Sequence, residues 1–286
     1  MKVYAIIVSF NPNIENLLRL CSLLTSQLTK VVIIDNSINE INFNQFRDVE
    51  VISLGANFGI ASAQNIGIQF ALDNGADIFI FFDQDSEIGN GFIEKLIAPM
   101  DLISPMVTTP VFYDKYTGYR FPSFKLSKYG FISKVYNENT NFNIDLMISS
   151  GSATNRLTID MVGLMNEDYF IDFVDIEWGL RCRAQNIPII VVSDAKMLHS
   201  IGDNSIDLKF IRLFIHSPIR TYYKIRNSFL FFSNFNVPFV LGLKEIISAI
   251  VHNFLLTFFV DNKKAHVFIC LKAIKDGILG VKGKKI

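Results

Sequence analysis

The chain is long enough to bury a sizeable core, and its charges balance. It has 286 residues, of which 50% are apolar and 27 are Phe, and its formal net charge at pH 7 is zero. Such a composition excludes a globally disordered protein. The length fits one large domain, or one domain with a smaller appendage. We expect no nucleic-acid partner.

The charge is divided unevenly along the chain. Residues 1–203 carry 14 Lys and Arg against 23 Asp and Glu, whereas residues 204–286 carry 13 against 4. An acidic pocket can hold a metal ion, and a basic, apolar tail can meet an anionic surface. The asymmetry therefore predicts two regions with different tasks.

The cysteines and the N-terminus indicate a protein of a reducing compartment. Cys21, Cys182 and Cys270 lie far apart without paired spacing, which is typical of small core residues and not of disulfides or a zinc site. The apolar run Val3–Val8 is too short for a signal peptide, and no small-residue cleavage site follows it. We therefore predict a first strand there and a cytoplasmic protein.

Strands and helices are expected to alternate along the first hundred residues. Strands are predicted at Val3–Phe10, Val31–Ile34, Val51–Leu54 and Ile78–Phe82, and helices over 14–28 and 61–74. Residues 105–145 are turn-rich and resist assignment. Further on, the pattern predicts a helix over 175–185, a strand over Ile187–Val192, and helices from about 207 that are broken at Pro218 and Pro238. The fold class is therefore α/β, with a mostly parallel sheet flanked by helices.

Polar residues follow the ends of the expected strands. Ligands of open parallel sheets bind beyond the carboxyl ends of the strands. At these ends the chain carries Ser9, Asp35, Asn57, Asp83 and Asp85. These side chains are therefore expected to converge on one edge of the sheet, as a nucleotide site requires.

Asp83 and Asp85 are candidates for binding a divalent cation. A diphosphate leaving group carries charge that a hard cation neutralises, and such cations prefer oxygen ligands. One carboxylate can bind Mg²⁺ or Mn²⁺ while the other orients a ribose or a bound water. The alternative is a turn with an Asp at each end, since Asp is common in turns.

Asp35 and the segment after the third strand are candidates for nucleotide binding. Asp35 can accept a hydrogen bond from a pyrimidine base N–H, or it can serve as a cap or turn former. The segment Asn57–Gly59, followed by Asn65, opens a helix with small residues. This allows a ligand to approach the backbone, or simply allows helix and sheet to pack. The glycine spacing does not match the dinucleotide-binding motif.

A second acidic cluster lies among aromatic and aliphatic residues at 170–178. It contains Asp172, Asp175 and Glu177. Removal from water raises the pKa of a carboxyl toward the range useful for a general base. Asp175 also suits the N-cap of a helix, which would fix its orientation. Trp178 can stack on a sugar face, although a core position is the simpler interpretation.

His199 and a basic, aromatic cluster complete the set of candidates. His199 ends an apolar run and is either structural or a metal ligand. Arg220 and Tyr223 follow Pro218 in a cluster that can contact the phosphates of a lipid carrier or close over a donor. The alternative is a solvated helix face.

The C-terminal region is apolar and basic. Residues 229–243 and 246–260 are each short of the roughly 20 residues that span a bilayer, and residues 263–285 contain seven Lys. This combination predicts amphipathic helices that lie on a membrane surface. A buried helical hairpin or a homodimer interface is the alternative.

Taken together, these pieces resemble a family 2 glycosyltransferase of the GT-A fold, and most closely the bacterial rhamnosyltransferases of O-antigen and capsule assembly. The resemblance covers roughly residues 1–230, and the order and spacing of its motifs carry it. They are Val8–Pro12, Ile34–Ser37, Asn57–Ala61 with Asn65 and Gly67, Asp83–Ser86, Ile148–Ser152, Phe170–Trp178 with Arg181, and His199–Asp203. It implies a catalytic domain at 1–206, with nucleotide-sugar binding in about 1–100 and acceptor binding in about 101–206. A membrane-associating region would follow at 207–286.

The resemblance also implies a role for each candidate. Asp35 would contact the base and Asp83 the ribose, Asp85 and His199 would hold the metal, and Asp175 would deprotonate the acceptor hydroxyl. Asp175 matches the aspartate of the family's Glu-Asp motif and is therefore preferred over Asp172 as the base, although Val174 stands where many members have Glu. The other expected donor contacts are Ser9, Asn57, Gly59, Asn65, Arg220 and Tyr223.

The implied reaction is an inverting transfer from a nucleotide sugar. The donor would be dTDP-L-rhamnose and the acceptor a polyprenyl-diphosphate-linked sugar, at the inner face of the bacterial plasma membrane. Galactofuranose, glucose or another deoxysugar are alternatives for the transferred group. A sugar-phosphate nucleotidyltransferase would carry a Gly-rich phosphate loop where this chain has Ser9–Pro12. A non-catalytic membrane-surface scaffold is the non-enzymatic alternative, and retention of Asp83, Asp85, Asp175 and His199 argues against it.

Overall fold

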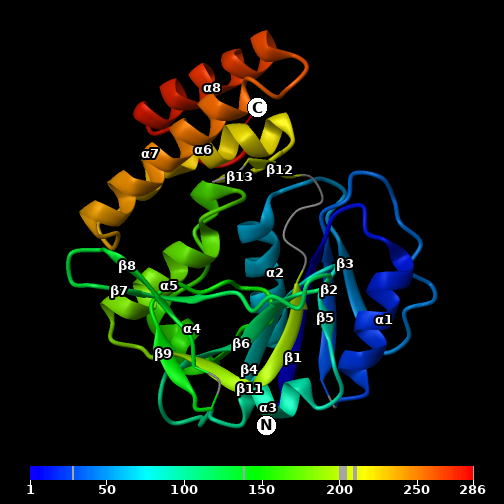
Figure 1. Cartoon of the computed structure of the whole chain (residues 1–286). Coiled ribbons are helices and arrows are strands. Elements are labelled where there is room, and N and C mark those ends of the chain that lie inside the picture. The colour runs from blue at the N-terminus through cyan, green and yellow to red at the C-terminus, as the bar shows by residue number, and fades with distance from the viewer. Residues whose placement is uncertain (28, 138, 200–204, 209–210, 286) are drawn as a thin grey trace.

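The central feature of the protein is one mixed β-sheet with helices on both sides (Figure 1). The structure is a computed structural model that describes residues 1–27, 29–137, 139–199, 205–208 and 211–285, with the backbone alone at 199, 205–208, 211 and 212. The first part of the chain forms β1 (Val3–Ser9), α1 (Ile14–Thr25), β2 (Lys30–Asp35), β3 (Val49–Ser53), α2 (Ile60–Asp73), β4 (Ile78–Asp83), β5 (Glu87–Ile88) and α3 (Phe92–Ile97).

The second part of the chain completes the sheet and adds a helical layer. It forms β6 (Val107–Asp114), β7 (Ser123–Leu126), β8 (Ile132–Val135), β9 (Phe142–Ile144), β10 (Ala153–Asn155), α4 (Arg156–Val162), a 3-10 helix (Glu167–Tyr169), α5 (Val174–Ala184) and β11 (Ile189–His199). It ends with β12 (Ser205–Leu208), β13 (Ile211–Phe214), α6 (Pro218–Ser233), α7 (Phe239–Leu256) and α8 (Lys263–Ile278).

The sheet is mostly parallel, as the alternation of strands and helices predicts. Its order among the described residues is β3-β2-β1-β4-β10-β6-β11-β5, and β9 also pairs with β11. Strands β3, β2, β1 and β4 are parallel, as are β6 and β11. The short strands β5, β9 and β10 are antiparallel to their neighbours. Three of the strands from β6 to β9 in the unassigned region, and β10 after it, are short, so apolar periodicity had little length in which to reveal them.

The strands are apolar on both faces because both faces of the sheet are covered. Ile6 and Ile34 belong to the core beneath α2 and α5, whereas Ala5 and Ile33 belong to the core beneath α1 and α3. Each such side chain contributes about 1.5–3 kcal/mol when fully buried. The cysteines Cys21 and Cys182 are free and buried, as expected of core residues.

The C-terminal helices form a separate layer that packs on the end of the α/β part, beside α5 (Figure 1). The prediction of helix from about 207 was wrong at its start, because the hairpin β12–β13 precedes the helices. Pro218 occupies the first turn of α6, and Pro238 is the N-cap of α7. These positions suit proline because the first helical N–H groups have no intrahelical partner.

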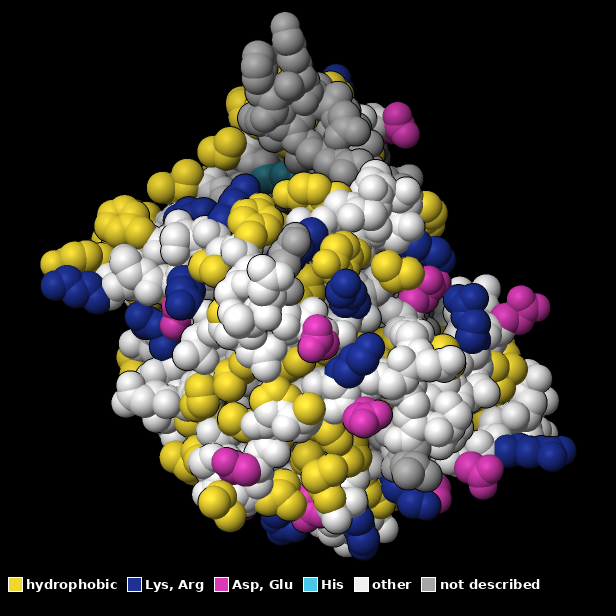
Figure 2. Space-filling model, turned by 60° about the horizontal axis from the view of Figure 1, so that its bottom comes forward, with side chains coloured by type: hydrophobic (Ala, Val, Ile, Leu, Met, Phe, Trp, Pro, Cys, Tyr) yellow, Lys and Arg dark blue, Asp and Glu magenta, His cyan; other side chains and the backbone are white. Residues whose placement is uncertain are grey.

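The opposite end of the molecule has a mixed surface. Figure 2 shows the face that lies at the bottom of Figure 1, near the N-terminus, where acidic and basic side chains are interspersed among apolar ones. The sheet therefore separates this mixed surface from the helical layer near the carboxyl ends of β1, β2 and β4.

Candidate active site

The carboxyl ends of β1, β2 and β4 bring three predicted site residues side by side. Ser9 pairs with Asp35 in the register of β1 and β2, and Val8 pairs with Asp83 in the register of β1 and β4. The side chain of Gln84 bridges back to the main chain of Phe10, with Phe10 N donating to Oε1 at 2.7 Å. The expected convergence of these residues is confirmed.

Asp35 is a buried carboxylate that three local donors hold in place. Ser9 Oγ donates at 2.8 Å, Ser37 Oγ at 2.7 Å and Ser37 N at 3.3 Å, all to Oδ1 of Asp35. No described residue donates to Oδ2. One oxygen is therefore fixed by the fold while the other is left to accept a hydrogen bond from a ligand. The sequence suggested Ser9 as a donor contact, and in the structure its hydroxyl orients Asp35.

The segment Asn57–Gly59 is shaped by protein contacts. Asn57 Oδ1 accepts from Gly59 N at 2.9 Å, and the side chain of Asn36 donates to Gly59 O at 3.1 Å and accepts from Phe58 N at 3.1 Å. Gly59 has φ +88°, and a Cβ there would lie 2.5 Å from the carbonyl oxygen of Phe170. Glycine is therefore needed here for the close approach of Phe170. The motif Ile34–Ser37 contained Asn36, but no pattern in the sequence indicated its bridging role.

Asn65 and Tyr223, two of the expected donor contacts, are turned toward the protein interior. Asn65 Nδ2 donates to Met165 O at 3.0 Å and to Glu167 Oε1 at 2.8 Å, and its Oδ1 accepts from Met165 N at 2.8 Å. Tyr223 is 2% exposed, and its hydroxyl accepts a hydrogen bond from Lys285 N at 2.7 Å. Both side chains therefore stabilise the walls around the site.

Asp83 lies at the edge of the site in a poorly solvated position. Burial, and then the charge of Asp85, raise the pKa of Asp83 to about 6, whereas Ser150 and the charge of Arg220 oppose the shift. The Ser150 hydroxyl accepts from Asp83 N at 3.3 Å and lies 2.9 Å from Ser86 Oγ. Asp85 itself is exposed. The loop around Ser150 therefore sets the surroundings of the first carboxylate.

The same loop reaches the second carboxylate, Asp175. Ser149 N donates to Asp175 Oδ2 at 3.3 Å, and Ile176 N donates to Oδ1 at 2.9 Å. Burial raises the pKa of Asp175 to about 6 despite these hydrogen bonds, and the charge of Asp83 adds to the rise. The main chain of Asp83 and the carboxylate of Asp175 therefore bind neighbouring residues of one loop, and the charge of Asp83 reaches Asp175. The motif Ile148–Ser152 marked this loop, but the sequence did not reveal its role.

The N-cap of α5 differs from the prediction. Phe173 is the N-cap, with φ +65°, and Asp175 lies inside the first turn. A carboxylate there still interacts favourably with the helix dipole. Asp172 lies before the helix and pairs with Arg220, whose Nη2 is 3.1 Å from Asp172 Oδ1. Arg220 therefore lies at the site, and its partner Asp172 is engaged in an ion pair.

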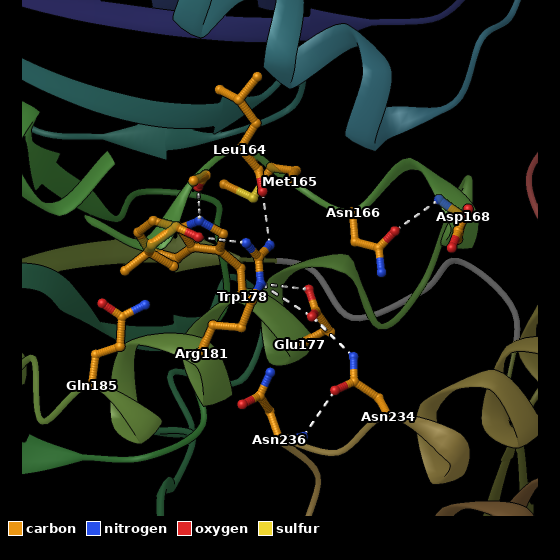
Figure 3. A network of polar contacts seen from close by, with 12 residues as sticks. Leu164, Met165, Asn166, Asp168, Glu177, Trp178, Arg181, Gln185, Asn234 and Asn236 are labelled. Carbon is orange, nitrogen blue, oxygen red and sulfur yellow. Dashed lines mark hydrogen bonds and ion pairs between the residues drawn. The ribbon is translucent and has the colours of Figure 1, made fainter. Parts of the chain in front are cut away.

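The rest of the second acidic cluster has a structural role. Figure 3 shows Arg181 between Glu177 and the main chain near Leu164. Arg181 Nε donates to Glu177 Oε2 at 3.1 Å, and its Nη2 donates to Leu164 O at 2.8 Å. Trp178 is fully buried, and its Nε1 donates to Gly163 O at 2.9 Å. The core interpretation of Trp178 is confirmed, which leaves Asp175 as the acidic residue of α5 that faces Asp83.

The donor set at the end of β4 suits a divalent cation that keeps several non-protein ligands. Asp83 and Asp85 present carboxylate oxygens whose like charges repel each other, and a cation bound between them would relieve this repulsion. Among the described side chains, no group of three or more His, Cys, Asp or Glu gathers in a metal-binding arrangement. The side chain of His199 and the segment Ser200–Asp203 lie outside the described residues, so the proposed imidazole ligand stays a prediction.

Sequence comparisons add a relative that matches almost the whole chain. The family model for glycosyl transferase family 2 matches residues 4–162. A dTDP-rhamnosyl transferase of Shigella flexneri, RfbF, is 39% identical over 286 residues, which cover 98% of this chain and 97% of the relative.

Solved structures with little sequence identity share the fold. TarS 1-349 of S. aureus in complex with UDP-GlcNAc has a TM-score of 0.57 at 13% identity, over 98% of this chain and 82% of that one. GalNAc-T7 with UDP, GalNAc and Mn²⁺ has a TM-score of 0.58 at 15% identity, over 88% of this chain and 57% of that one. The family model and the near full-length relative together establish that this chain belongs to glycosyltransferase family 2.

Proposed function

We propose that the protein is an inverting rhamnosyltransferase that transfers L-rhamnose from dTDP-L-rhamnose to a lipid-linked glycan of a bacterial surface polysaccharide. The observation that carries the proposal is the meeting of Asp83 and Asp175 at the loop Ser149–Ser150. A nucleotide-sugar enzyme of this kind needs one carboxylate at the donor and one at the acceptor hydroxyl. The donor is proposed from the relative, whose name specifies dTDP-rhamnosyl transfer.

In the proposed mechanism Asp175 is the general base. Its carboxylate takes the proton of the acceptor hydroxyl, and the oxygen forms a bond to the anomeric carbon of rhamnose. The bond from that carbon to the diphosphate oxygen breaks on the opposite face, and dTDP leaves with the electron pair. A pKa of about 6 suits this role because the carboxylate is ionised at neutral pH yet is basic enough to accept a proton.

The other proposed roles concern the donor. The free Oδ2 of Asp35 accepts a hydrogen bond from the thymine N–H, and Asp83 orients the ribose. Asp85, with His199, would hold Mg²⁺ or Mn²⁺, whose charge stabilises a departing diphosphate when it is bound. Asn57 and Gly59 shape the rim beside the thymine base.

The acceptor diphosphate is proposed to bind at the start of α6. Arg220 pairs with Asp172 at 3.1 Å, and Lys224 Nζ lies 3.3 Å from His216 Nε2. No described carboxylate lies within ion-pair distance of Lys224, although burial lowers its pKa and thereby disfavours its charge. A cationic group without an anionic partner is a reasonable site for a phosphate. His216 also faces His252 of α7, with 6.3 Å between ring centroids, so this cluster links the active site to the apolar helical layer.

The membrane surface is proposed to contact α7 and α8. Exposed apolar residues recur every three or four positions along α7, and α8 has a similar stripe that includes Phe268 and Leu271. Those of α7 are Phe239, Leu243, Ile247, Ile250, Val251 and Phe254, and Phe258 follows just after the helix. Exposed lysines, among them Lys264 and Lys272, accompany the stripe on α8. An apolar face with cations beside it favours the interface of an anionic membrane.

α7 also meets the length and composition of a membrane-crossing helix. It has 18 residues with a mean hydropathy of 1.6, and 28% of these residues are buried. It packs against α6 in the helical layer, and Lys244 and Glu245 interrupt its apolar sequence. We therefore favour a helix lying in the interface on the cytoplasmic side, with a homodimer contact as the competing use of the same stripe.

Vesicle binding separates the membrane from the dimer. We expect the protein to sediment with phosphatidylglycerol vesicles, and the double substitution Phe254→Ser with Phe258→Ser to reduce this binding by about 10-fold or more. Tyr116→Ser, at an exposed position 80% accessible in the turn after β6, is the matched control. A stable dimer in size-exclusion chromatography with no vesicle binding would favour the dimer.

The function is tested with a panel of donors. The full chain is incubated with dTDP-L-rhamnose, UDP-galactofuranose or UDP-glucose, and a polyprenyl-diphosphate sugar, with Mn²⁺, Mg²⁺ or a chelator. Metal-dependent release of dTDP from dTDP-L-rhamnose with inverted product would support the proposal. Turnover with another donor only would change the assignment of the transferred sugar. No turnover with any donor, together with no nucleotide binding by calorimetry, would favour the non-catalytic scaffold.

A further inference from the structure

The loop before Asp175 has an unusual backbone. Phe170, Asp172 and Phe173 have φ values of +64°, +62° and +65°. Side chains with a Cβ rarely adopt this region unless their surroundings enforce it. Something outside the loop must therefore hold it in this shape.

Two adjacent residues of α6 bind the carbonyl groups of this loop. Asn227 Nδ2 donates to Tyr169 O at 2.7 Å and to Ile171 O at 2.6 Å. Arg226, which is completely buried, donates through Nη2 to Tyr169 O at 3.1 Å and to Asp168 O at 3.3 Å. The loop is therefore attached to the helical layer through its main chain.

The same arginine also binds the segment that follows α8. Arg226 Nη1 donates to Val281 O at 3.1 Å and to Gly283 O at 2.9 Å. Gly283 N in turn donates to Asp168 O at 2.8 Å, and Lys282 Nζ lies 2.8 Å from Asp168 Oδ2. The guanidinium of Arg226 thus joins two segments that also bind each other directly.

The contacts continue to the nucleotide side of the site. The ring of Tyr223, whose hydroxyl holds Lys285 N, stacks on Phe170 with 4.6 Å between centroids. Phe170 O accepts a hydrogen bond from Ile60 N at 2.8 Å, at the start of α2. Lys284 Nζ lies 5.9 Å from the centre of the Phe58 ring. The segment Val281–Lys285 therefore reaches both walls of the site.

We propose that Arg226 and the segment Val281–Lys285 form a positioning element of the active site, which holds the loop 168–173 so that Asp175 faces the acceptor hydroxyl. The element touches neither substrate nor the reacting atoms, and it acts through the loop. The proposal rests on the assignment of Asp175 as the base in the proposed function. It gives these C-terminal residues a catalytic task in addition to any contact with a membrane.

The direct test removes the segment. A chain ending at Gly280 is compared with the full chain for kcat, for KM of the donor, and for hydrogen exchange of amides 168–176. We expect kcat to fall by about 10- to 100-fold, because small displacements of a catalytic group have such effects. We expect the donor KM to change by less than about threefold, because Ser9 and Ser37 hold Asp35 and the removed segment does not. We expect hydrogen exchange of amides 168–176 to become faster. Lys30→Gln removes an exposed lysine at the start of β2, outside these contacts and outside the proposed membrane surface, and serves as the control.

Two point variants keep the test decisive if the shortened chain does not fold. Gly283 has φ +65°, so Gly283→Ala strains the segment without removing it, and we expect a fall in kcat of a few fold. Arg226→Lys keeps the positive charge but cannot donate hydrogen bonds to both segments at once. We therefore expect its kcat to fall as that of Gly283→Ala does, and the retained charge should not restore the wild-type value. Unchanged kcat in the folded variants, or unchanged exchange of 168–176, would overturn the proposal.

The exchange measurement also separates this proposal from the proposed function. It needs no substrate, so it reports on the loop even if dTDP-L-rhamnose is not the donor. A wild-type chain that is inactive with this donor would contradict the donor assignment alone. Exchange that is the same with and without residues 281–286 would contradict the positioning element alone.

Discussion

The two sides of the active site are held in place in different ways. On the nucleotide side, Asp35 is fixed by Ser37, two positions along the chain, and by Ser9 on the neighbouring strand. On the side of the proposed general base, called the base side below, the loop before Asp175 is held by Asn227, at least 55 positions away. The nucleotide side therefore depends on pairing of the first strands, whereas the base side depends on completion of the C-terminal helices. Variants on the two sides should have different kinetic signatures.

The largest effect is expected on the base side, at the carboxylate itself. Asp175→Asn keeps the size of the side chain but cannot accept the proton, so kcat should fall by about 10²- to 10⁴-fold. Binding of dTDP by calorimetry should be nearly unchanged. Asp172→Asn is the matched control, because Asp172 pairs with Arg220 and should retain more activity than Asp175→Asn. If Asp172→Asn is the more damaging of the two, the base assignment must be exchanged.

The attachment of the base side to α6 is tested by Asn227→Ala. This change removes the 2.6 Å hydrogen bond to Ile171 O, whereas Tyr169 O keeps those from Ile171 N and Arg226. A buried group that loses its partner costs about 1–3 kcal/mol. We expect a lower free energy of unfolding in urea, and a kcat about 10-fold lower with little change in donor KM. Equal effects on kcat and donor KM would mean that the two sides are not held independently.

The nucleotide side is tested by Ser37→Ala. The change removes the 2.7 Å hydrogen bond to Asp35 and the acceptor of Asn11 N at 2.8 Å. Asp35 would keep its hydrogen bond from Ser9, so we expect a donor KM raised by up to about 10-fold, at the upper end of a typical hydrogen bond. The value of kcat at saturating donor should stay within about twofold. A loss of kcat with unchanged donor KM would contradict the expectation that the two sides have different kinetic signatures.

The same contrast explains how far the sequence could be interpreted alone. Strand ends such as Asp35 and Asp83 follow apolar runs, and parallel strands bring their carboxyl ends together, so local pattern was sufficient to predict the nucleotide side. The protein contacts of Asn65 and Tyr223 could not be predicted, because their hydrogen-bond partners are remote in sequence. Asp175 was proposed because it matches a family motif. The apolar periodicity of the sequence does not indicate that Ser149 N binds its carboxylate.

The pH dependence of activity should report mainly on the base side. The pKa of Asp175 is raised to about 6 by burial, so the active, ionised form is lost as the pH falls through 6. The readout is kcat at saturating donor, because the pKa of Asp83 is also raised to about 6 and its protonation would lower kcat/KM through donor binding. We expect this kcat to be flat above about pH 7 and to be reduced about 10-fold near pH 5. Ser37→Ala should show the same limb, because it leaves the surroundings of Asp175 intact. A flat profile down to pH 5 would contradict the raised pKa of the base.

Protein stability should respond to pH in the opposite sense. A carboxyl whose pKa is higher in the folded state than in the unfolded chain favours folding at low pH, and this contribution is lost as the pH rises through about 6. Asp83 and Asp175 both behave in this way. Asp175→Asn, which cannot ionise, should therefore gain stability relative to the wild type at pH 8 compared with pH 5, when both are measured by urea unfolding.

The smallest effect is expected at Trp178, on the same helix as Asp175 but facing the core. Trp178→Phe loses one hydrogen bond to Gly163 O and some volume, which should lower the free energy of unfolding by about 1–3 kcal/mol. Because the loop 168–173 is held by α6 and not by this indole, kcat and donor KM should both stay close to wild type at temperatures where the protein is folded. A large loss of kcat in folded Trp178→Phe would mean that the core beneath α5 positions the base, and that the helical layer is not its main support.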